Sequence, residues 1–403
     1  MALKLLINSL YRGGAEKQLA ALAGRLPADE LLLLENEVSQ AASPAPRPLS
    51  AHGSGTSPLL KTAFIPVYAR RLSALAGRGD TVLSFMERAN LVNVLAGRRS
   101  GHRSVICERT RPSGEFSGLR GLLMRPLISR YYPLADIVVA NSEGVRRDLA
   151  ANFGVPAEKV RVIHNACDAA AIAAAAAAPL PEGWAGVYAR PVLVTSGRLT
   201  AAKGHWHLLR IFRELKAAAP EAALVLVGEG ELKEPLRRLA GELGLETFSG
   251  EGAPPAGADV YFAGFRENPY PFLARASLFV FTSLWEGFPN ALLEALACGV
   301  PAAAADCAAG PREIIAPASD LSSVAAVPER SPYGLLLPPL SGNRLGAGPA
   351  EPAEELWADA LRAFLADAPE LKRCAEAGRL RAADFSPARA DRLWRELLGL
   401  KAI

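Results

Sequence analysis

The sequence contains no run near the roughly 20 consecutive apolar residues that a membrane-spanning helix requires, although half of its 403 residues are hydrophobic. Its opening segment, MALKLLINSL, runs into a Gly-Gly turn without a small-residue cleavage site, so we expect no secretory signal. Cysteine is scarce: five residues, an odd number without a CxxC pair, favour reduced, mostly buried thiols over a disulfide framework or a zinc site. These absences predict an intracellular protein without a structural metal.

Charge is distributed unevenly along the chain. Residues 1–180 contain 22 Lys and Arg against 14 Asp and Glu, a balance of +8, whereas residues 181–403 contain 23 against 27, a balance of −4. A basic half indicates an anionic partner, which is a nucleic acid, an anionic membrane surface or a phosphorylated substrate. No homeodomain, zinc-finger or RNA-recognition pattern is present. We therefore expect no nucleic acid among the partners.

Short apolar runs alternate with helix-length amphipathic stretches, as is typical of parallel sheets with crossover helices. The expected strands are Leu3–Ile7, Leu31–Leu34, Thr81–Phe85, Ser104–Cys107, Ile137–Ala140 and Val160–Ile163, then Val192–Thr195, Ala223–Val227, Val260–Phe262, Leu278–Phe281, Pro301–Ala304 and Gly334–Leu337. The pattern predicts two doubly wound α/β domains, 1–170 and 185–385, facing a central cleft. We expect the helix near 386–403 to pack back on the first domain.

Three segments are expected to lack regular structure. The alanine tract from Asp168 to Pro181 ends in Pro-Leu-Pro and has no amphipathic pattern, so we interpret it as the connection between the domains. Residues 41–58 and 338–352 are rich in Pro, Gly, Ser and Ala and predict mobile loops. They are either insertions without a role in function or a lid over a substrate.

The segment Glu286–Glu294, written EGFPNALLE, places two carboxylates eight positions apart. If Gly287, Phe288 and Pro289 form a loop and Asn290 opens a helix, Glu286 lies before the helix and Glu294 one turn inside it. The first acid can accept hydrogen bonds from sugar hydroxyls and the second from a ribose, while the helix N-terminus favours a phosphate. The alternative is a capped surface helix with solvated glutamates.

Three other strand-to-helix turns carry glycine or cations. Gly13 and Gly14 follow the first strand, where paired glycines allow positive φ and a close approach of backbone amides to a ligand. Arg198 and Lys203 flank the loop that opens the second domain, and together they can neutralise a diphosphate, unless they are merely solvated. The GxG at Gly228 lacks the third glycine of a dinucleotide fingerprint.

In order and spacing, these segments resemble the retaining glycosyltransferases of family 4, which have the two-domain GT-B fold. The resemblance spans nearly the whole chain, and the motifs that carry it are Gly13-Gly14-Ala15-Glu16, Ser196-Gly197-Arg198-Leu199 with Lys203-Gly204, Val227-Gly228-Glu229-Gly230, Phe262-Ala263-Gly264-Phe265, Glu286-Gly287-Phe288-Pro289-Asn290 through Glu294-Ala295, and Cys298-Gly299-Val300-Pro301.

The resemblance implies a role for each matched residue. Arg198 and Lys203 would hold the diphosphate of a nucleotide-sugar donor, Glu294 its ribose and Glu286 the transferred sugar. The backbone around Gly264 and Phe265 would meet the base, and the loop at Gly13 and Gly14 would lie over the phosphates or the sugar. The family commonly has a histidine after the fourth strand of the first domain, where this chain has Arg109. Arginine cannot act as a general base at neutral pH, so its role there is open.

The acceptor is predicted less directly. The segment Asp306–Ile314 and the pair Glu108-Arg109 are similar to a subset of the family that builds lipid-linked oligosaccharides or polysaccharides, often with N-acetylgalactosamine. Four arginines in a loop and an apolar helix can meet a pyrophosphate and a membrane surface, unless they are solvated residues of a core-packing helix; they are Arg111, Arg120, Arg125 and Arg130. This interpretation predicts a peripheral protein on the inner face of the cytoplasmic membrane.

No Asp-x-Asp sequence occurs in the chain. This removes the usual carboxylate pair for a metal bound to a nucleotide-sugar, so we expect a metal-independent enzyme without a cofactor. His205 and His207 do not suggest a metal site either, because residues two apart on a helix face different ways. The alternatives are a transferase with a soluble small-molecule acceptor, a non-catalytic GT-B glycan-binding protein, and a sugar-phosphate epimerase or a phosphorylase, the last of which would bring pyridoxal phosphate.

Overall fold

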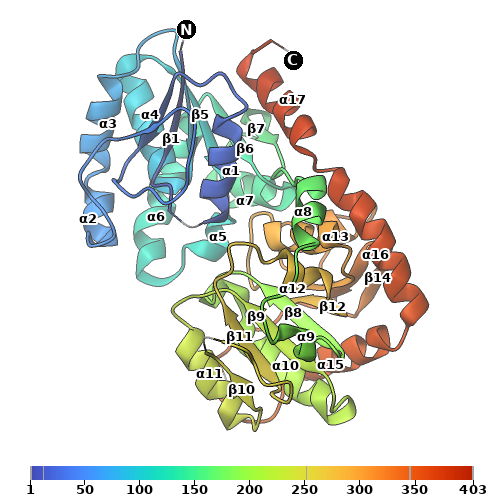
Figure 1. The fold of residues 1–403 in the computed structure, drawn as a ribbon. Coiled ribbons are helices and arrows are strands. Elements are labelled where there is room, and N and C mark those ends of the chain that lie inside the picture. Colours follow the sequence, from blue (N-terminus) through green and yellow to red (C-terminus); the bar gives the residue numbers. More distant parts are fainter. Residues whose placement is uncertain (1, 12, 251, 345, 402–403) are drawn as a thin grey trace. The chain divides into compact units, whose positions relative to one another are not determined.

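The computed structural model describes every residue except 1, 12, 251, 345 and 402–403. The chain forms two compact units, shown in Figure 1. Unit 1 comprises Met1–Ala166 together with Pro387–Ile403, and unit 2 comprises Cys167–Ser386. The chain thus returns to its first unit after completing the second.

Unit 1 is built on a seven-stranded parallel sheet with the order β3-β2-β1-β4-β5-β6-β7. The strands are β1 Leu3–Ile7, β2 Glu30–Leu33, β3 Pro46–Pro48, β4 Thr81–Phe85, β5 Arg103–Glu108, β6 Ile137–Ala140 and β7 Val160–Val162. The helices are α1 Gly14–Ala23, α2 Pro58–Ala63, α3 Ile65–Ser73, α4 Glu87–Ser100, α5 Pro112–Glu115, α6 Gly118–Tyr131, α7 Glu143–Phe153 and α17 Pro387–Leu398, with short 3-10 turns at Tyr132–Leu134 and Ala157–Lys159.

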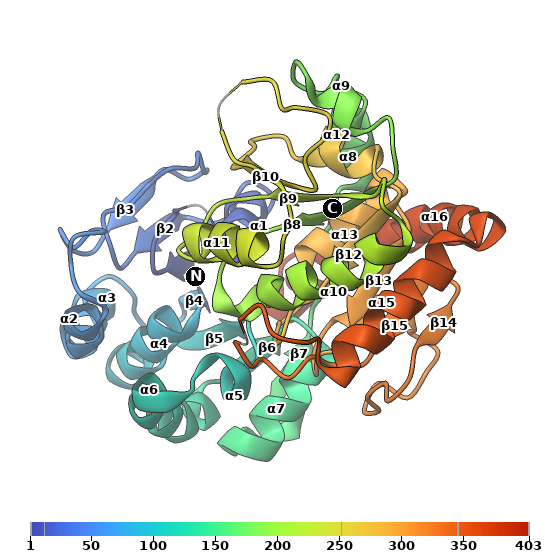
Figure 2. The ribbon, with the colours of Figure 1, turned by 90° about the horizontal axis from the view of Figure 1, so that it is seen from below.

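Helices cover both faces of this sheet, so its central strands are buried. All five residues of β1 are buried, as expected for a parallel strand covered on both sides. One face packs against α1 and α17 in a core that includes Leu19 and Trp394. Figure 2 shows α3, α4 and α6 together on the other face. Of these helices, only α17 comes from the end of the chain.

Unit 2 is built on an eight-stranded sheet with the order β10-β11-β9-β8-β12-β13-β15-β14, parallel except for the pair β14 and β15. The strands are β8 Val192–Ser196, β9 Ala223–Val227, β10 Thr247–Phe248, β11 Val260–Gly264, β12 Leu278–Phe281, β13 Ala302–Ala305, β14 Glu329–Ser331 and β15 Gly334–Leu337. The helices are α8 Ala169–Ala176, α9 Trp184–Val187, α10 His205–Ala218, α11 Lys233–Glu242, α12 Tyr270–Ala274, α13 Asn290–Cys298, α14 Pro311–Ile315, α15 Pro352–Leu365 and α16 Ala368–Ala383, with a 3-10 turn at Ala201–Lys203.

Residues of each strand in unit 2 alternate between two cores, because successive side chains of a strand point to opposite faces. Val192 and Val194 of β8 pack with α8, α12 and α13, whereas Leu193 packs with α10, α11 and α15. The two Rossmann-like units agree with the predicted α/β fold class. The five cysteines are buried and unbridged, as their number and spacing predict.

The alanine tract is not a connection. Asp168 caps α8 by accepting a hydrogen bond from the Ala171 amide at 3.0 Å, and the helix packs on α12 and α13 through Ile172 and Ala176. Small alanine side chains allow close helix packing without an amphipathic pattern. The boundary between the units therefore lies before this helix, between residues 166 and 167.

The structure corrects the first predicted loop and shows that the second, although irregular, is anchored. Residues 41–58 contain β3, which pairs with β2 at the edge of the sheet. The described part of 338–351 has no helix or strand, but it is tied to α10, because the fully buried Arg210 donates to the carbonyl groups of Gly346, Gly348 and Pro349. The buried Arg210 side chain fixes this loop, and the composition of the loop gives no sign of that contact.

Candidate functional site

The strand order of unit 2 places a site between two particular strands. Strands β9, β10 and β11 lie on one side of β8, and strands β12 to β15 lie on its other side. The strand order therefore reverses between β8 and β12. In open parallel sheets, ligands bind beyond the carboxyl ends of the strands at such a switch point. The loop after β8 carries Arg198 and Lys203, and the loop after β12 carries Glu286. Topology therefore gathers the predicted diphosphate and sugar residues.

Lys203 and Glu286 are in direct contact. The Lys203 ammonium donates a short hydrogen bond to the Glu286 carboxylate, and it lies 5.3 Å from the centre of the Phe281 ring. The two charged side chains are 21% and 13% exposed, so the pair is partly shielded from water. The Thr282 hydroxyl donates to the Lys203 carbonyl at 3.0 Å and holds the two loops together. A shielded, oriented cation is suited to stabilising phosphate charge.

Two glycines make this close packing of loops possible. Gly204 has φ of +58°, and a Cβ atom on it would lie 2.6 Å from the Thr282 carbonyl oxygen. A Cβ atom on Gly228, after β9, would lie 1.9 Å from the Gly197 carbonyl oxygen. The loops after β8 and β9 are further joined by a hydrogen bond of 2.9 Å from the Leu199 amide to the Glu229 carbonyl. The GxG turn therefore serves backbone packing beside the site.

The loop from Gly287 to Pro289 leads into α13, which begins at Asn290 as the sequence predicts. Gly287, Phe288 and Pro289 are all buried. Phe288 packs on Phe385 with ring centres 5.3 Å apart. The Phe288 side chain thus anchors the loop, and any contact of this segment with a ligand falls to its backbone.

Glu294 lies one turn inside α13 and is half-buried. Burial raises the pKa of Cys167 and Cys298 to about 12, and the nearby Glu294 charge adds to both shifts. Burial and the same charge also raise the pKa of Tyr270. Glu294 therefore lies near Tyr270 of α12 and near Cys167, which precedes α8, a setting that its position in the motif does not indicate.

The remaining predicted donor residues of unit 2 are more exposed. Arg198 is exposed, and its guanidinium has no hydrogen bond or ion pair with the described residues. Gly264 has φ of +73° and accepts a hydrogen bond of 2.9 Å from the Gly228 amide. The Phe265 side chain, which follows it, is 48% exposed. An exposed aromatic ring at this edge is suited to stacking with a base.

Gly13 and Gly14 do not use positive φ. Gly13 is extended, with φ of −139°, and α1 begins at Gly14 rather than near Lys17. A Cβ atom on Gly13 would lie 2.1 Å from a carboxylate oxygen of Glu16, but that atom is the end of a flexible side chain and can move away. The predicted conformational reason for this glycine pair is therefore wrong.

Arg109 follows β5 in unit 1 and is half-buried. Its guanidinium lies 4.8 Å from the centre of the Phe85 ring, donates to the Asn165 side chain and contacts Cys107 Sγ at 3.6 Å. It lines a small hollow of about 10 Å³ between α1 and α17, together with Gln18, Leu22, Arg25, Phe85, His164, Ala166, Ala390 and Trp394. Arg109 is thus held by neighbours of its own unit.

The four predicted acceptor arginines differ in their surroundings. Arg111 pairs with Asp148 at 3.3 Å, and Arg120 pairs with Glu87 and Glu115 at 3.3 and 3.2 Å. Arg125 lies 5.8 Å from the centre of the Phe153 ring, and Arg130 is exposed in the last turn of α6. Three leucines on the same helix, Leu119, Leu122 and Leu123, are 87%, 75% and 43% exposed. This mixed apolar and basic surface extends beyond the predicted arginines.

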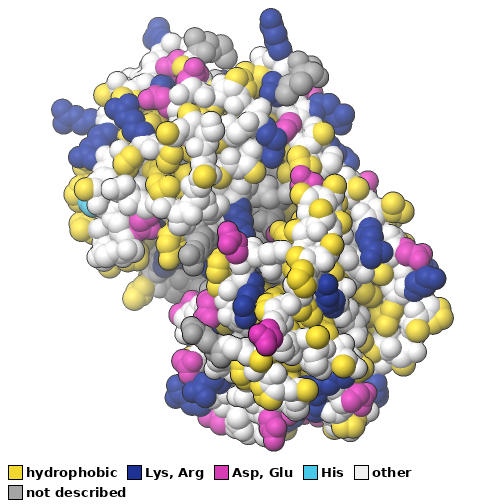
Figure 3. All heavy atoms as spheres, viewed as in Figure 1, with side chains coloured by type: hydrophobic (Ala, Val, Ile, Leu, Met, Phe, Trp, Pro, Cys, Tyr) yellow, Lys and Arg dark blue, Asp and Glu magenta, His cyan; other side chains and the backbone are white. Residues whose placement is uncertain are grey.

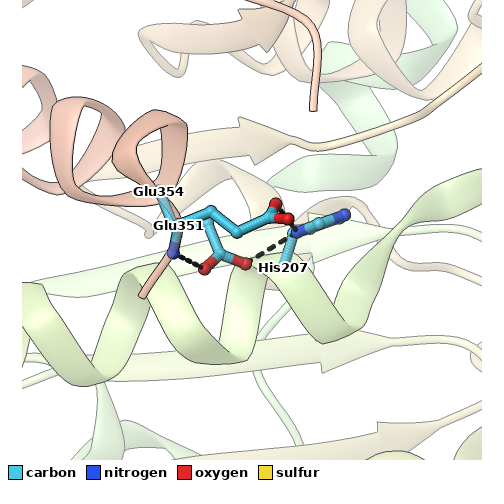
Figure 4. A group of neighbouring side chains, drawn as sticks. All are labelled: His207, Glu351 and Glu354. Carbon is cyan, nitrogen blue, oxygen red and sulfur yellow. Dashed lines mark hydrogen bonds and ion pairs between the residues drawn. The ribbon is translucent and has the colours of Figure 1, made fainter. Parts of the chain in front are cut away.

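His207, Glu351 and Glu354 form the cluster drawn in Figure 4, whose ligand atoms lie within 4.8 Å of one another. Glu354 accepts hydrogen bonds from His207 Nδ1 at 2.7 Å, from Arg210 Nε at 2.9 Å and from the Glu351 amide at 2.7 Å. His207 Nε2 in turn accepts from the Gly342 amide at 3.1 Å. With both ring nitrogens and the buried carboxylate used in this way, the cluster holds α15 and the 338–351 loop on α10.

Two buried polar residues beside the site were not predicted as site residues. His205 begins α10 and is buried, and burial followed by the Lys203 charge lowers its pKa to about 3. Ser283 is buried after β12, and its hydroxyl has no hydrogen-bond partner among the described residues. Only their position in the strand order could have pointed to them.

Comparison with known proteins adds independent findings. Residues 12–171 match the family model Glycosyltransferase Family 4, and residues 187–330 match Glycosyl transferases group 1. The chain is 31% identical over 322 residues to the N-acetylgalactosamine-N,N'-diacetylbacillosaminyl-diphospho-undecaprenol 4-alpha-N-acetylgalactosaminyltransferase of Campylobacter jejuni, covering 77% of this chain and 82% of that protein. It is 28% identical over 334 residues to an uncharacterized glycosyltransferase of Methanocaldococcus jannaschii, covering 79% of each.

Among solved structures, Anabaena HepE in complex with UDP-glucose superposes with a TM-score of 0.71 at 21% identity, covering 99% of this chain and 100% of that one. The lipopolysaccharide outer core galactosyltransferase WaaB superposes with a TM-score of 0.65 at 16% identity, covering 99% of each. These likenesses show the fold, and the sequence relatives show the family. The chain belongs to the glycosyltransferases of GT-B type.

Proposed function

We propose that this glycosyltransferase moves a hexose or N-acetylhexosamine, with retention, from a UDP-linked donor to a polyprenyl-diphosphate-linked sugar or a growing glycan. The observation that supports donor binding is the contact between Lys203 and Glu286 at the switch point of unit 2. The printed name of the Campylobacter relative describes a diphospho-undecaprenol-linked substrate, and HepE was solved with UDP-glucose. Both descriptions support the proposal by analogy.

In the donor half, each side chain has a distinct task. Lys203 is oriented by Glu286 and Phe281, so a diphosphate meets a cation that needs little reorganisation. The exposed Arg198 supplies a second, bidentate cation. Glu286 accepts hydrogen bonds from the sugar and Glu294 from the ribose, with Phe265 beside the base. The cations provide the charge that a metal supplies in other transferases, so we propose a metal-independent reaction.

The chemistry is a same-face substitution. The acceptor hydroxyl oxygen forms a bond to the anomeric carbon while the bond from that carbon to the diphosphate oxygen breaks. The hydroxyl proton passes to the departing diphosphate, which therefore acts as the base and no protein nucleophile is needed. Positioning and charge stabilisation supply most of the rate.

We assign acceptor binding to unit 1, at an anionic membrane surface. The exposed leucines of α6 can enter the headgroup region while Arg125 and Arg130 meet anionic groups. On the face shown in Figure 3, Lys and Arg side chains gather beside hydrophobic ones over the part of unit 1 where α3 lies in Figure 1. Within the described residues, no helix is both long and apolar enough to cross a bilayer.

The donor is tested by thermal shift with UDP- and GDP-sugars, followed by transfer to polyprenyl-diphosphate sugars. We expect UDP-sugars to raise the melting temperature and a labelled sugar to appear on the lipid. Stabilisation by GDP-sugars alone would contradict the UDP assignment. Transfer only to soluble small molecules would contradict the acceptor assignment.

Membrane contact is tested by flotation with vesicles containing anionic lipid at low salt. Replacing Leu119 and Leu122 with serine should release the protein from the vesicles. The matched control is Leu380→Ser in unit 2, since Leu380 is 74% exposed and Leu122 is 75% exposed. Equal binding by all three proteins, or no binding by the unaltered one, would refute the membrane assignment.

A further inference from the structure

Strand β5 of unit 1 sends neighbouring residues to opposite faces of its sheet. Cys107 joins the core formed with α1 and α17, and Arg109 contacts its sulfur on that side. Glu108 lies between them in sequence and reaches Tyr132, which follows α6 on the other face. This alternation follows from the two-residue period of a strand. Glu108 is therefore separated from the Arg109 guanidinium while remaining next to its backbone.

The Glu108 carboxylate holds the turn that follows β5. Its Oε1 atom accepts hydrogen bonds from the amides of Arg109 at 2.9 Å and Thr110 at 3.2 Å. Its Oε2 atom accepts from the Tyr132 hydroxyl at 2.7 Å, and that hydroxyl accepts from the Asn90 side-chain amide at 3.1 Å. Three donors thus converge on one carboxylate, and its backbone bonds fix the first two residues beyond the strand.

This carboxylate is costly to keep in place. Glu108 is fully buried, and burial, with a contribution from the charge of Glu87, raises its pKa to about 7. The nearby titratable groups are Glu87 on α4, which pairs with Arg120 of α6, then Tyr132 on the same face of the sheet and Cys107 on the opposite face. None of these is a cation that compensates Glu108 directly. A buried acid without a paired cation destabilises a fold, so its presence points to a task.

The turn that Glu108 holds lies beside the switch point of unit 1. Its sheet order reverses between β1 and β4, and β5 is the next strand. At the end of β4, Met86 has φ of +76°, and its amide donates to the Cys107 carbonyl at 3.2 Å. A non-glycine residue with positive φ is a form of backbone strain that is concentrated at functional sites. The ends of β4 and β5 are therefore joined by a hydrogen bond, and Arg109 follows directly after β5.

We propose that Glu108 is a positioning residue for the acceptor half of the reaction, fixing the Arg109-Thr110 backbone so that Arg109 is presented at the carboxyl edge of unit 1. The inference rests on the proposed function, because it takes unit 1 as the acceptor-binding unit. It gives a task to Glu108, which the sequence analysis named only as part of a motif, and it gives Arg109 a role that depends on placement rather than on proton transfer.

The test is a double-mutant cycle with Glu108→Ala, Arg109→Ala and their combination, together with Glu108→Gln. The alanine variant removes both backbone acceptors, whereas glutamine keeps a carbonyl oxygen for them. The matched control is Asp136→Ala, since Asp136 accepts from the Ser104 amide at 2.7 Å near the opposite, amino end of β5. The readouts are the donor KM, the acceptor kcat/KM, its pH profile, and amide hydrogen exchange of residues 107–113.

We expect Glu108→Ala to lower the acceptor kcat/KM by about 10-fold or more, with the donor KM unchanged, because small misplacements are expensive in catalysis. With Arg109 already replaced, the same change should add less than about 2-fold, since the two residues act as a unit. Glutamine should retain activity and remove an inflection near pH 7, where the ionised acid binds the amides more strongly. Exchange of the 109–110 amides should rise in Glu108→Ala and not in Asp136→Ala.

Equal losses from Glu108→Ala in both Arg109 backgrounds, or unchanged exchange of the 109–110 amides, would overturn the proposal. Failure of the proposed function looks different, because the unaltered protein would then transfer no sugar to lipid-linked acceptors in any assay. In that case, hydrogen exchange still decides whether Glu108 fixes the turn.

Discussion

Replacing Lys203 with alanine probes the donor site most directly. The substitution removes the ammonium that contacts Glu286 and the Phe281 ring, and leaves a carboxylate that is only 13% exposed without this partner. If Lys203 stabilises the charge that develops on the leaving diphosphate, kcat should fall by about 10² to 10³, which corresponds to roughly 3–4 kcal/mol of transition-state stabilisation.

The loss of an ion pair also affects folding, and a control elsewhere in unit 2 separates the two effects. Lys216 of α10 pairs with Asp259 at 2.7 Å, and the side chains are 18% and 16% exposed, close to the 21% and 13% of Lys203 and Glu286. Removing either lysine leaves one half-buried carboxylate unpaired, at a cost of about 1–3 kcal/mol of unfolding free energy. Only the Lys203 variant should lose turnover.

The assay is steady-state transfer from a labelled nucleotide-sugar at saturating acceptor, with unfolding free energies measured by denaturant titration. We expect both variants to be destabilised to a similar extent and Lys203→Ala alone to show the predicted fall in kcat. Unchanged turnover in Lys203→Ala, or equal losses of turnover in the two variants, would refute the leaving-group assignment.

Three further outcomes follow from the structure. Gly228→Ala should lower the unfolding free energy by about 3 kcal/mol, because its Cβ atom would lie 1.9 Å from the Gly197 carbonyl oxygen. The control Gly241→Ala in α11 should be neutral or stabilising, because a Cβ atom there has nothing within 4 Å. Denaturant titration measures both unfolding free energies, and equal effects would contradict the packing argument. The raised pKa of Glu108 stabilises the fold at pH values below its ordinary pKa of 4.5, and this stabilisation is lost as pH rises through about 7. Between pH 4 and 8, the unfolding free energy of the wild type should therefore fall by roughly 3 kcal/mol relative to that of Glu108→Gln. If the unfolding free energies of the two proteins change in parallel with pH, Glu108 is not a buried titrating acid. EDTA should leave the transfer rate unchanged, and a loss restored by added Mg²⁺ or Mn²⁺ would show that the cations of the site do not suffice.

Most strands of the fold can be predicted from local sequence patterns. The expected ranges for β1, β4, β6, β9, β12 and β15 coincide with the observed strands, because buried parallel strands are short runs of apolar residues with polar or glycine-rich ends. The strands β3, β10 and β14 were not predicted. They lie at or near sheet edges, are two or three residues long and contain residues such as Pro46 and Glu329, so only pairing with a neighbour defines them.

The candidate site divides in the same way. The order of the motifs indicated Arg198, Lys203, Glu286 and Glu294 as one set, and the helix start at Asn290 was predictable from the proline and asparagine that precede its apolar residues. The contact between Lys203 and Glu286, 83 positions apart, depends on the reversal of strand order between β8 and β12. The network around Glu108 likewise joins residues from three elements.

The sequence by itself therefore determined the alternation of strands and helices, the family, and the identity of the charged residues. Each of these depends on the periodicity of short segments or on their order along the chain. The tertiary structure alone decided that Lys203 meets Glu286, that Gly228 must be small because it packs against the Gly197 backbone, and that Glu108 is buried. Those facts depend on which strand ends become neighbours in a sheet, and that pairing is a property of the whole core rather than of any segment within it.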